Sequence, residues 1–308
     1  MNYLLSLLLV LVTASALAQD YATRFEAAWQ LVSERYYWQG DSAKAAWDEL
    51  KLEYEPQALA AQSETDFYRT LEKMYDELGD NHSVFVPPER VNDIREQYGD
   101  LPCLGVFAQA KPGNSYGHVS FELLEDDIGY IRLPDLASSN SAVNVRRAVS
   151  ELQADGAQRF VLDMRGNPGG RLVEMMQTAG VFTTGFLWRT VTRWTLPLPY
   201  PAIGTPETEL PLVILIDSEV NSAAEGLAGA LQQRGRATII GERSAGNVEA
   251  VLPFCLRDGS QAWIASGVLA PIGAPTWEGR GVTPDIEVLS QDALDAALTY
   301  FNSEAGKN

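Results

Sequence analysis

Short apolar runs and amphipathic segments alternate along the second half of the chain, and this alternation constrains the fold more than any other feature. The predicted elements are, in order, residues 140–154 (helix), 159–164 (strand), 171–180 (helix), 211–216 (strand), 223–233 (helix) and 236–241 (strand). Such a succession is typical of parallel strands covered by helices. Before it, the alternating stretches His118–Glu122 and Ile128–Leu133 predict strands as well. The sequence therefore predicts an α/β fold.

The first part of the chain has a helical pattern. Apolar side chains recur at three- and four-residue steps in residues 20–79, and Gly79 is a typical helix stop. These residues are interpreted as a small helical N-terminal cap on one α/β core. Two connections are predicted, a hairpin-like one at Leu101–Phe121 and a Pro-rich surface excursion at 197–211.

Composition excludes several classes of protein. The 308 residues are 46% hydrophobic, which is ordinary for a globular chain and rules out collagen-like and wholly disordered proteins. A net charge of −18, from 41 acidic and 23 basic residues, repels phosphate backbones and anionic lipid, so no nucleic-acid partner is expected. The sequence contains neither a CxxC nor an HExxH motif, the spacings typical of zinc sites, and no metal is expected. A disulfide between Cys103 and Cys255 and two buried thiols both remain open.

The first residues are typical of a targeting segment. Residues 4–17 are apolar but short for a membrane span, and Ala16-Leu17-Ala18 suits signal peptidase. We expect a signal peptide over residues 1–18 and export of the mature chain to the periplasm or outside the cell. An uncleaved anchor is the alternative. No later run reaches membrane length, so no span is expected after cleavage.

Ser222 lies where an apolar strand gives way to a helix of small residues. A strand ending at Ile216 is followed by a polar turn, and the predicted helix begins just after Ser222. Unpaired N–H groups and the positive end of the helix dipole converge there, which suits a nucleophile whose substrate develops an oxyanion. The structural alternative is that Ser222 is an ordinary N-cap.

Two further segments have residues suited to chemistry. The run 163–170, Asp-Met-Arg-Gly-Asn-Pro-Gly-Gly, follows a strand, and its glycines let backbone N–H groups approach a ligand, although it could be only a tight turn. His82 follows a helix stop and precedes an apolar stretch, although a lone histidine is more often a packing or surface residue. His118 has no glycine-framed setting and is interpreted as a bystander.

The order of His82, the glycine turn, Ser222 and the run 278–285 (Glu-Gly-Arg-Gly-Val-Thr-Pro-Asp) resembles the tail-specific, or carboxy-terminal processing, serine peptidase family. The similarity covers roughly residues 78–290 and is strongest to the tricorn-core-like branch without a PDZ module. The resemblance implies a crotonase/ClpP-like core of repeated β-β-α units. It also implies hydrolysis of peptides or unfolded polypeptides with no cofactor.

The branches of this family activate serine differently. In the processing proteases a lysine downstream of the serine is the base, but Asn247 occupies that position, and no lysine lies between Lys111 and Lys307. Arginine cannot replace it because it stays protonated. The tricorn-like branch uses histidine backed by glutamate. The resemblance therefore implies the following site: catalytic Ser222, His82 and Glu278; oxyanion-hole amides from Ala223 and from Gly169 or Gly170; and supporting Asn81 and Asn247. Glu225 is expected only to favour the helix N-terminus.

The predicted organisation has four parts: a signal peptide (1–18), a helical cap with His82 (19–100), a peptidase core (101–292), and a C-terminal helix and tail (293–308). The predicted function is an exported serine peptidase acting through an acyl-enzyme. A non-catalytic protein that binds peptides or hydrophobic ligands on the same fold is one alternative, and an esterase is another. The oligomeric state is not predicted.

Overall fold

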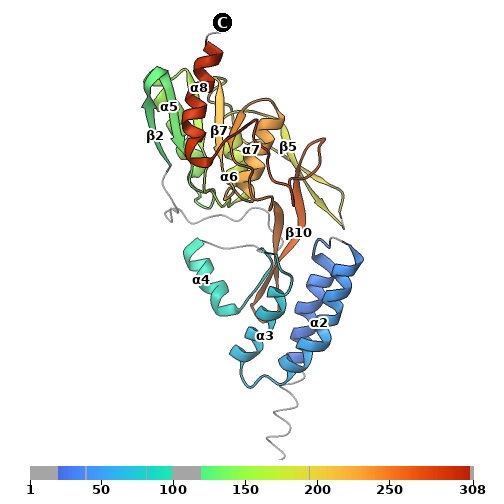
Figure 1. Cartoon of the computed structure of the whole chain (residues 1–308). Helices are drawn as coiled ribbons and strands as arrows, with labels where there is room; N and C mark the ends of the chain where they lie inside the picture. The colour runs from blue at the N-terminus through green and yellow to red at the C-terminus, as the bar shows by residue number, and fades with distance from the viewer. Residues whose placement is uncertain (1–19, 39, 81, 99–118, 194, 306–308) are drawn as a thin grey trace, which may run out of the picture. The chain divides into compact units, whose positions relative to one another are not determined.

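The structure is a computed structural model that describes residues 20–38, 40–80, 82–98, 119–193 and 195–305. The chain forms two compact units (Figure 1). Unit 1 lies within residues 1–109 and 251–267, and unit 2 within 110–250 and 268–308. The two segments of unit 1 are separated in the sequence by residues 110–250, which belong to unit 2.

Unit 1 is a helical layer on a short β ladder. Its helices are residues 20–35, α2 (Asp41–Leu59), α3 (Glu64–Asp76) and α4 (Pro88–Tyr98). Strand β1 (Val84–Val86) pairs antiparallel with the start of β10 (Gln261–Pro271). Aromatic side chains fill the core, where the rings of Tyr21 and Phe67 stack with centroids 4.5 Å apart. The helical prediction for residues 20–79 is confirmed, with breaks between the helices.

Unit 2 is built on a six-stranded sheet in the order β11-β8-β7-β4-β3-β2. Its strands are β2 (Ser120–Leu124), β3 (Ile128–Arg132), β4 (Arg159–Asp163), β7 (Leu212–Ile216), β8 (Thr238–Gly241) and β11 (Ile286–Glu287). All neighbours in this sheet are parallel except β2 and β3, which form an antiparallel pair. The predicted α/β fold with parallel strands is confirmed.

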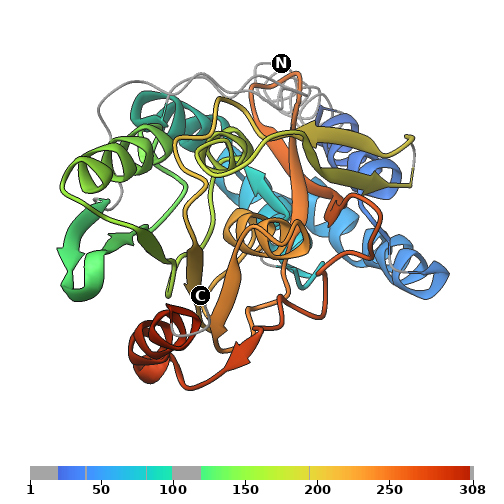
Figure 2. The same ribbon diagram turned by 90° about the horizontal axis from the view of Figure 1, so that it is seen from above.

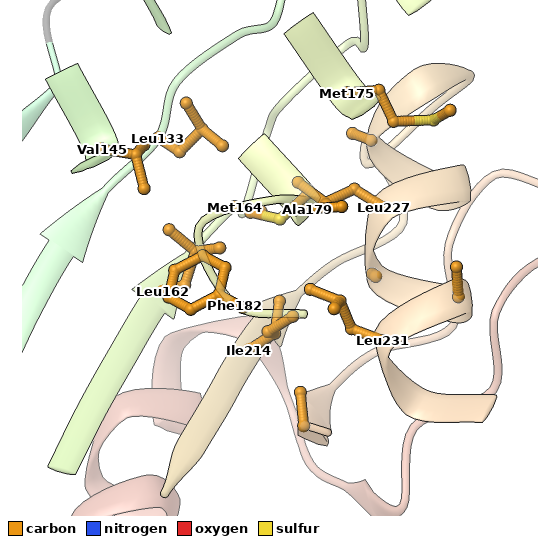
Figure 3. Close-up of a cluster of buried hydrophobic side chains, with 14 of the residues drawn as sticks. Leu133, Val145, Leu162, Met164, Met175, Ala179, Phe182, Ile214, Leu227 and Leu231 are labelled. Carbon is orange, nitrogen blue, oxygen red and sulfur yellow. The ribbon is translucent and has the colours of Figure 1, made fainter. Parts of the chain in front are cut away.

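Helices cover both faces of this sheet, and the alternation of side chains along each strand explains how. Leu162 and Ile214 pack in one core with α5 (Ser141–Ala154), α6 (Leu172–Ala179) and α7 (Ala223–Gln233). Val161 and Val213, one residue earlier, pack on the other face against α8 (Ala293–Ala305). The layers can be followed in Figures 1 and 2. Figure 3 shows the first core, where side chains of α6 and α7 meet those of β4 and β7.

A second sheet was not predicted. It contains β1, β10, β5 (Phe186–Thr192) and β6 (Leu198–Pro201), and β9 (Glu249–Cys255) also pairs with β10. The predicted surface excursion at 197–211 is exposed at its start, but its first residues form an edge strand that was not predicted, since β6 pairs antiparallel with β5. Pro199 and Pro201 concealed this strand from sequence analysis. They are tolerated because β6 is an edge strand, where a missing N–H costs no ladder hydrogen bond.

Several sequence predictions fall outside the described residues. These include the signal peptide, most of the 101–121 connection, Asn81, Cys103 and His118. Cys255 is disulfide-bonded. No helix in the described part of the chain has both the length and the apolar character needed to cross a membrane.

Candidate active site

Ser222 occupies the N-cap of α7 but lacks the usual N-cap conformation. Its φ is 55° and its ψ is −124°, whereas an N-cap residue normally has an extended backbone. A side chain at positive φ costs on the order of 1–3 kcal/mol, and such strain gathers at functional sites. A sharp, strained turn between a strand and a helix is also the setting that presents a nucleophilic serine. The backbone of Ser222 thus differs from that of an ordinary N-cap residue.

Two acceptors hold the backbone of Ser222 in this conformation. Its N–H donates to the carbonyl oxygen of Asn247 at 3.0 Å and to Oε1 of Glu225 at 3.1 Å. Asn247 therefore lies beside the serine through its main chain, at the position where the resemblance aligned the family's lysine.

Glu225 is completely buried and joins the serine helix to the loop 244–247. Its Oε2 accepts the Ser244 hydroxyl and the Gly246 N–H, each at 2.6 Å, and its Oε1 accepts the Asn247 N–H at 2.8 Å. Sequence reasoning assigned Glu225 only a helix-dipole role. The signal for more was present, because Ser222 and Glu225 have the S-x-x-E spacing of a capping box.

The glycine turn packs directly against the start of α7. A Cβ on Gly169, where φ is 89°, would lie 2.6 Å from the Asn221 carbonyl oxygen and 2.9 Å from the Ala223 nitrogen. Only glycine allows that approach. The Asn221 N–H also donates to the Asn167 carbonyl oxygen at 3.0 Å. The turn and the serine segment, far apart in sequence, are therefore one local structure.

The two glycine amides of this turn differ. The Gly169 N–H donates to Oδ1 of Asn167 at 2.9 Å. Gly170 forms a parallel bridge with Leu136, whose hydrogen bonds use the Gly169 carbonyl and the Arg171 N–H. No partner for the N–H of Gly170 or of Ala223 is found among the described residues.

A buried carboxylate supports the base of the turn. Asp163 is 1% exposed, and its Oδ2 accepts from Arg165 and from the Tyr130 hydroxyl, each at 2.6 Å. Burial alone would raise the pKa of Asp163, but the hydrogen bonds from Arg165 and Tyr130 outweigh it and lower the pKa. Arg165 and the glycines that follow it are thereby fixed at the end of β4.

Glu278 lies in a turn that attaches to the same loop as Ser222. Its Oε2 accepts the Val248 N–H at 2.7 Å, and the N–H of Gly279 donates to the Gly246 carbonyl oxygen at 2.7 Å. Val248 follows Asn247, whose carbonyl holds the Ser222 N–H. Unit 2 therefore gathers Ser222, Asn247 and Glu278 in one local structure with the glycine turn.

His82 belongs to unit 1, between α3 and β1, and is half-buried. Oδ1 of Asp80 accepts the N–H groups of His82, at 2.8 Å, and of Ser83. The Ser83 hydroxyl in turn accepts the Ala265 N–H at 3.0 Å. The backbone that carries His82 is therefore fixed on both sides. No cluster of three or more potential metal ligands occurs among the described residues.

Comparison with known protein families gives two matches. Residues 127–288 match peptidase family S41, and residues 17–76 match the tricorn protease C1 domain. The first match spans the β3–β11 region, with the glycine turn, Ser222 and Glu278.

Curated relatives are similar over part of their length. The carboxyl-terminal-processing protease of Picosynechococcus sp. is 39% identical over 177 residues, which is 56% of this chain and 42% of the relative. The corresponding Synechocystis protease is 37% identical over 211 residues, 68% of this chain and 46% of the relative. The chain thus spans less than half the length of these relatives.

Solved structures show the same fold at low identity. A photosystem II D1 C-terminal processing protease has a TM-score of 0.68 at 20% identity, covering 88% of this chain and 94% of that one. The tricorn protease has a TM-score of 0.55 at 15% identity, covering 93% of this chain and 37% of that one.

Proposed function

This chain belongs to peptidase family S41, and from that membership we propose that it is an exported serine peptidase with the catalytic triad Ser222, His82 and Glu278. Its substrates are peptides or unfolded polypeptides, as the names of the curated relatives suggest. The reaction is acyl transfer, and the crotonase-like description of the core is part of this proposal.

Each triad residue has a distinct role. The neutral imidazole of His82 takes the proton from the Ser222 hydroxyl as its oxygen attacks the peptide carbonyl. Glu278 orients the ring and stabilises the imidazolium. The imidazolium then gives its proton to the leaving amine. In the second half of the reaction, His82 takes a proton from water as the water attacks the acyl-enzyme, and returns that proton to the Ser222 oxygen as the acyl group leaves. Asn247 stands where a Ser–Lys dyad would need a lysine, so histidine is the available base.

The oxyanion of the tetrahedral intermediate is bound by the N–H groups of Gly170 and Ala223. Both lack a partner within the described part of the chain, whereas the Gly169 N–H is engaged by Asn167. Gly169 serves instead by letting the turn approach the helix start. Losing one oxyanion donor typically costs about 100- to 1,000-fold in turnover.

The observation that carries this proposal is the positive φ of Ser222 next to the Ala223 amide, for which the described residues offer no partner. A serine that served only as a helix cap would adopt the extended N-cap backbone without strain. The strain is consistent with the presentation of a nucleophile.

The proposed location outside the cytoplasm is based on residues 1–18. Their short apolar run and Ala16-Leu17-Ala18 support cleavage by signal peptidase and export. We also propose that the sequence-predicted cap (19–100) and core (101–292) are the two functional units of the exported chain.

The experiment is fluorophosphonate labelling and peptide turnover by the purified full chain. Ser222→Ala should abolish both while the protein stays folded, and the control Ser303→Ala, an exposed position on α8, should change neither. Undiminished turnover by Ser222→Ala would refute the assignment. Peptide binding without labelling of the natural chain would favour the non-catalytic alternative, and turnover of esters alone would favour the esterase.

A further inference from the structure

Gly229 lies inside α7, the helix that begins after Ser222, at a position where alanine would be the better helix former. The structure shows why glycine is present. A Cβ on Gly229 would lie 2.5 Å from Cε2 of Trp277 and 2.6 Å from its Cζ2 and Nε1. The indole ring therefore rests directly on the helix backbone.

Trp277 immediately precedes Glu278, and its backbone is hydrogen-bonded within the same turn. Its carbonyl oxygen accepts the N–H of Arg280 at 2.9 Å and of Gly281 at 2.8 Å. The half-buried ring also packs against the main core of unit 2. The contacts of the ring with the helix and the core are thus made by a residue of the turn that contains Glu278.

Hydrogen bonds also join this turn to a loop and to the helix. The Val282 N–H donates to the Ser244 hydroxyl at 2.7 Å, and the Ser244 N–H donates to the Val282 carbonyl oxygen at 3.2 Å. The Thr283 carbonyl oxygen accepts from the side-chain amide of Gln232 on α7 at 2.9 Å. The contact of Trp277 with Gly229 also joins the turn to this helix, and it does so closer to Ser222 in the sequence.

We propose that Gly229 and Trp277 are positioning residues that set the place of Glu278 relative to Ser222; this rests on the proposed function. Gly229 lies seven residues after Ser222 on the same helix, so the rise of an α-helix puts it about 10 Å along the axis. The rigid helix thus fixes the distance between Ser222 and the Trp277 ring, which neighbours Glu278.

The arrangement predicts a specific sensitivity. The hydrogen bond between Glu278 Oε2 and the Val248 N–H is 2.7 Å long and joins the turn to the residue after Asn247. A ring pushed off Gly229 would lengthen that bond and misplace the carboxylate. Misplacement of a reacting group by about 1 Å can cost on the order of 100-fold in rate.

The test is a double-mutant cycle of Gly229→Ala and Trp277→Ala in the full chain. Values of kcat and KM are measured per active site, titrated with a fluorophosphonate. Gly229→Ala should lower kcat at least 10-fold with KM unchanged within 2-fold. In the Trp277→Ala background it should have no further effect, because no ring remains to be displaced. Trp277→Phe, which keeps a ring on Gly229, should retain kcat within 3-fold. This variant keeps the proposal testable even if Gly229→Ala does not fold.

Three results would overturn the assignment. The first is an unchanged kcat for Gly229→Ala together with a raised melting temperature, as expected if only helix propensity matters. The second is an equal loss with and without the indole ring. The third is a kcat for Trp277→Ala as high as that of the natural chain. If one of these results is found and the natural chain is labelled and active, only the positioning role is refuted and the proposed function stands. If the natural chain is neither labelled nor active, the proposed function and the positioning role are both refuted.

Discussion

Glu225 Oε1 accepts the Ser222 N–H at 3.1 Å, so the N-cap residue of α7 is held by a carboxylate in the first turn of the same helix. The same side chain accepts three hydrogen bonds from residues 244–247. One buried side chain therefore fixes the serine and the loop on which the Glu278 turn rests.

Replacing Glu225 by glutamine should destabilise the protein and slow labelling of Ser222. Both carboxylate oxygens accept hydrogen bonds, and an amide NH₂ would face N–H and O–H donors on one side. The unsatisfied groups should lower the free energy of unfolding by about 2 kcal/mol or more, measured by urea denaturation. Glu151→Gln, on the exposed face of α5, is the control and should leave the denaturation midpoint in place. Equal midpoints for the two variants would contradict the account.

The strain at Ser222 predicts an order of stability among inactive variants. Ser222→Gly should unfold with a free energy about 1 kcal/mol higher than Ser222→Ala, because glycine adopts a φ of 55° without a Cβ penalty. Urea denaturation of both variants measures the difference. A less stable glycine variant would mean that the backbone at this position is not strained.

The site residues also predict acid sensitivity. The pKa of Asp163 is lowered in the folded protein, chiefly by Arg165 and Tyr130 acting against burial, so the carboxylate stabilises the fold above its unfolded pKa of about 4. That contribution is lost as the pH falls through the folded-state pKa. Asp163→Asn should therefore lose unfolding free energy at pH 6 and show a shallower decline between pH 4 and pH 2. Parallel stability curves for the two proteins would contradict this.

Glu174 predicts the opposite sign. This residue is 3% exposed, and burial raises its pKa, although the Ala142 N–H bonds to Oε2 at 3.0 Å. Its stabilisation is present below the unfolded pKa of about 4.3 and is lost as the pH rises through the folded-state value. Glu174→Gln should thus gain stability over the natural chain at pH 7 and lose that advantage at pH 4. An advantage that is independent of pH would show that the charge is not the cause.

The parallel sheet and its helices were predictable because their sequence signals are local. Each strand such as 212–216 is a continuous apolar run, and each helix has a periodic apolar face. Strands β6 and β10 were missed because their partners lie elsewhere in the chain and because prolines break the pattern in β6.

The candidate site was predictable only in part. Ser222, Glu278 and the glycine turn follow strands or stand in recognisable motifs. Two sets of contacts join distant segments of the chain. Glu225 accepts hydrogen bonds from Gly246 and Asn247, and the Trp277 ring packs on Gly229. No periodicity encodes such contacts, so the residues that fix the site emerge only from the folded chain.

The most direct test of the triad is the rate at which a fluorophosphonate labels the full chain, with the modified residue identified by peptide mapping. The account predicts that the label lies on Ser222 and that His82→Ala lowers the labelling rate at least 100-fold, because the serine loses its base. A label on another residue, or an unchanged rate in His82→Ala, would contradict it.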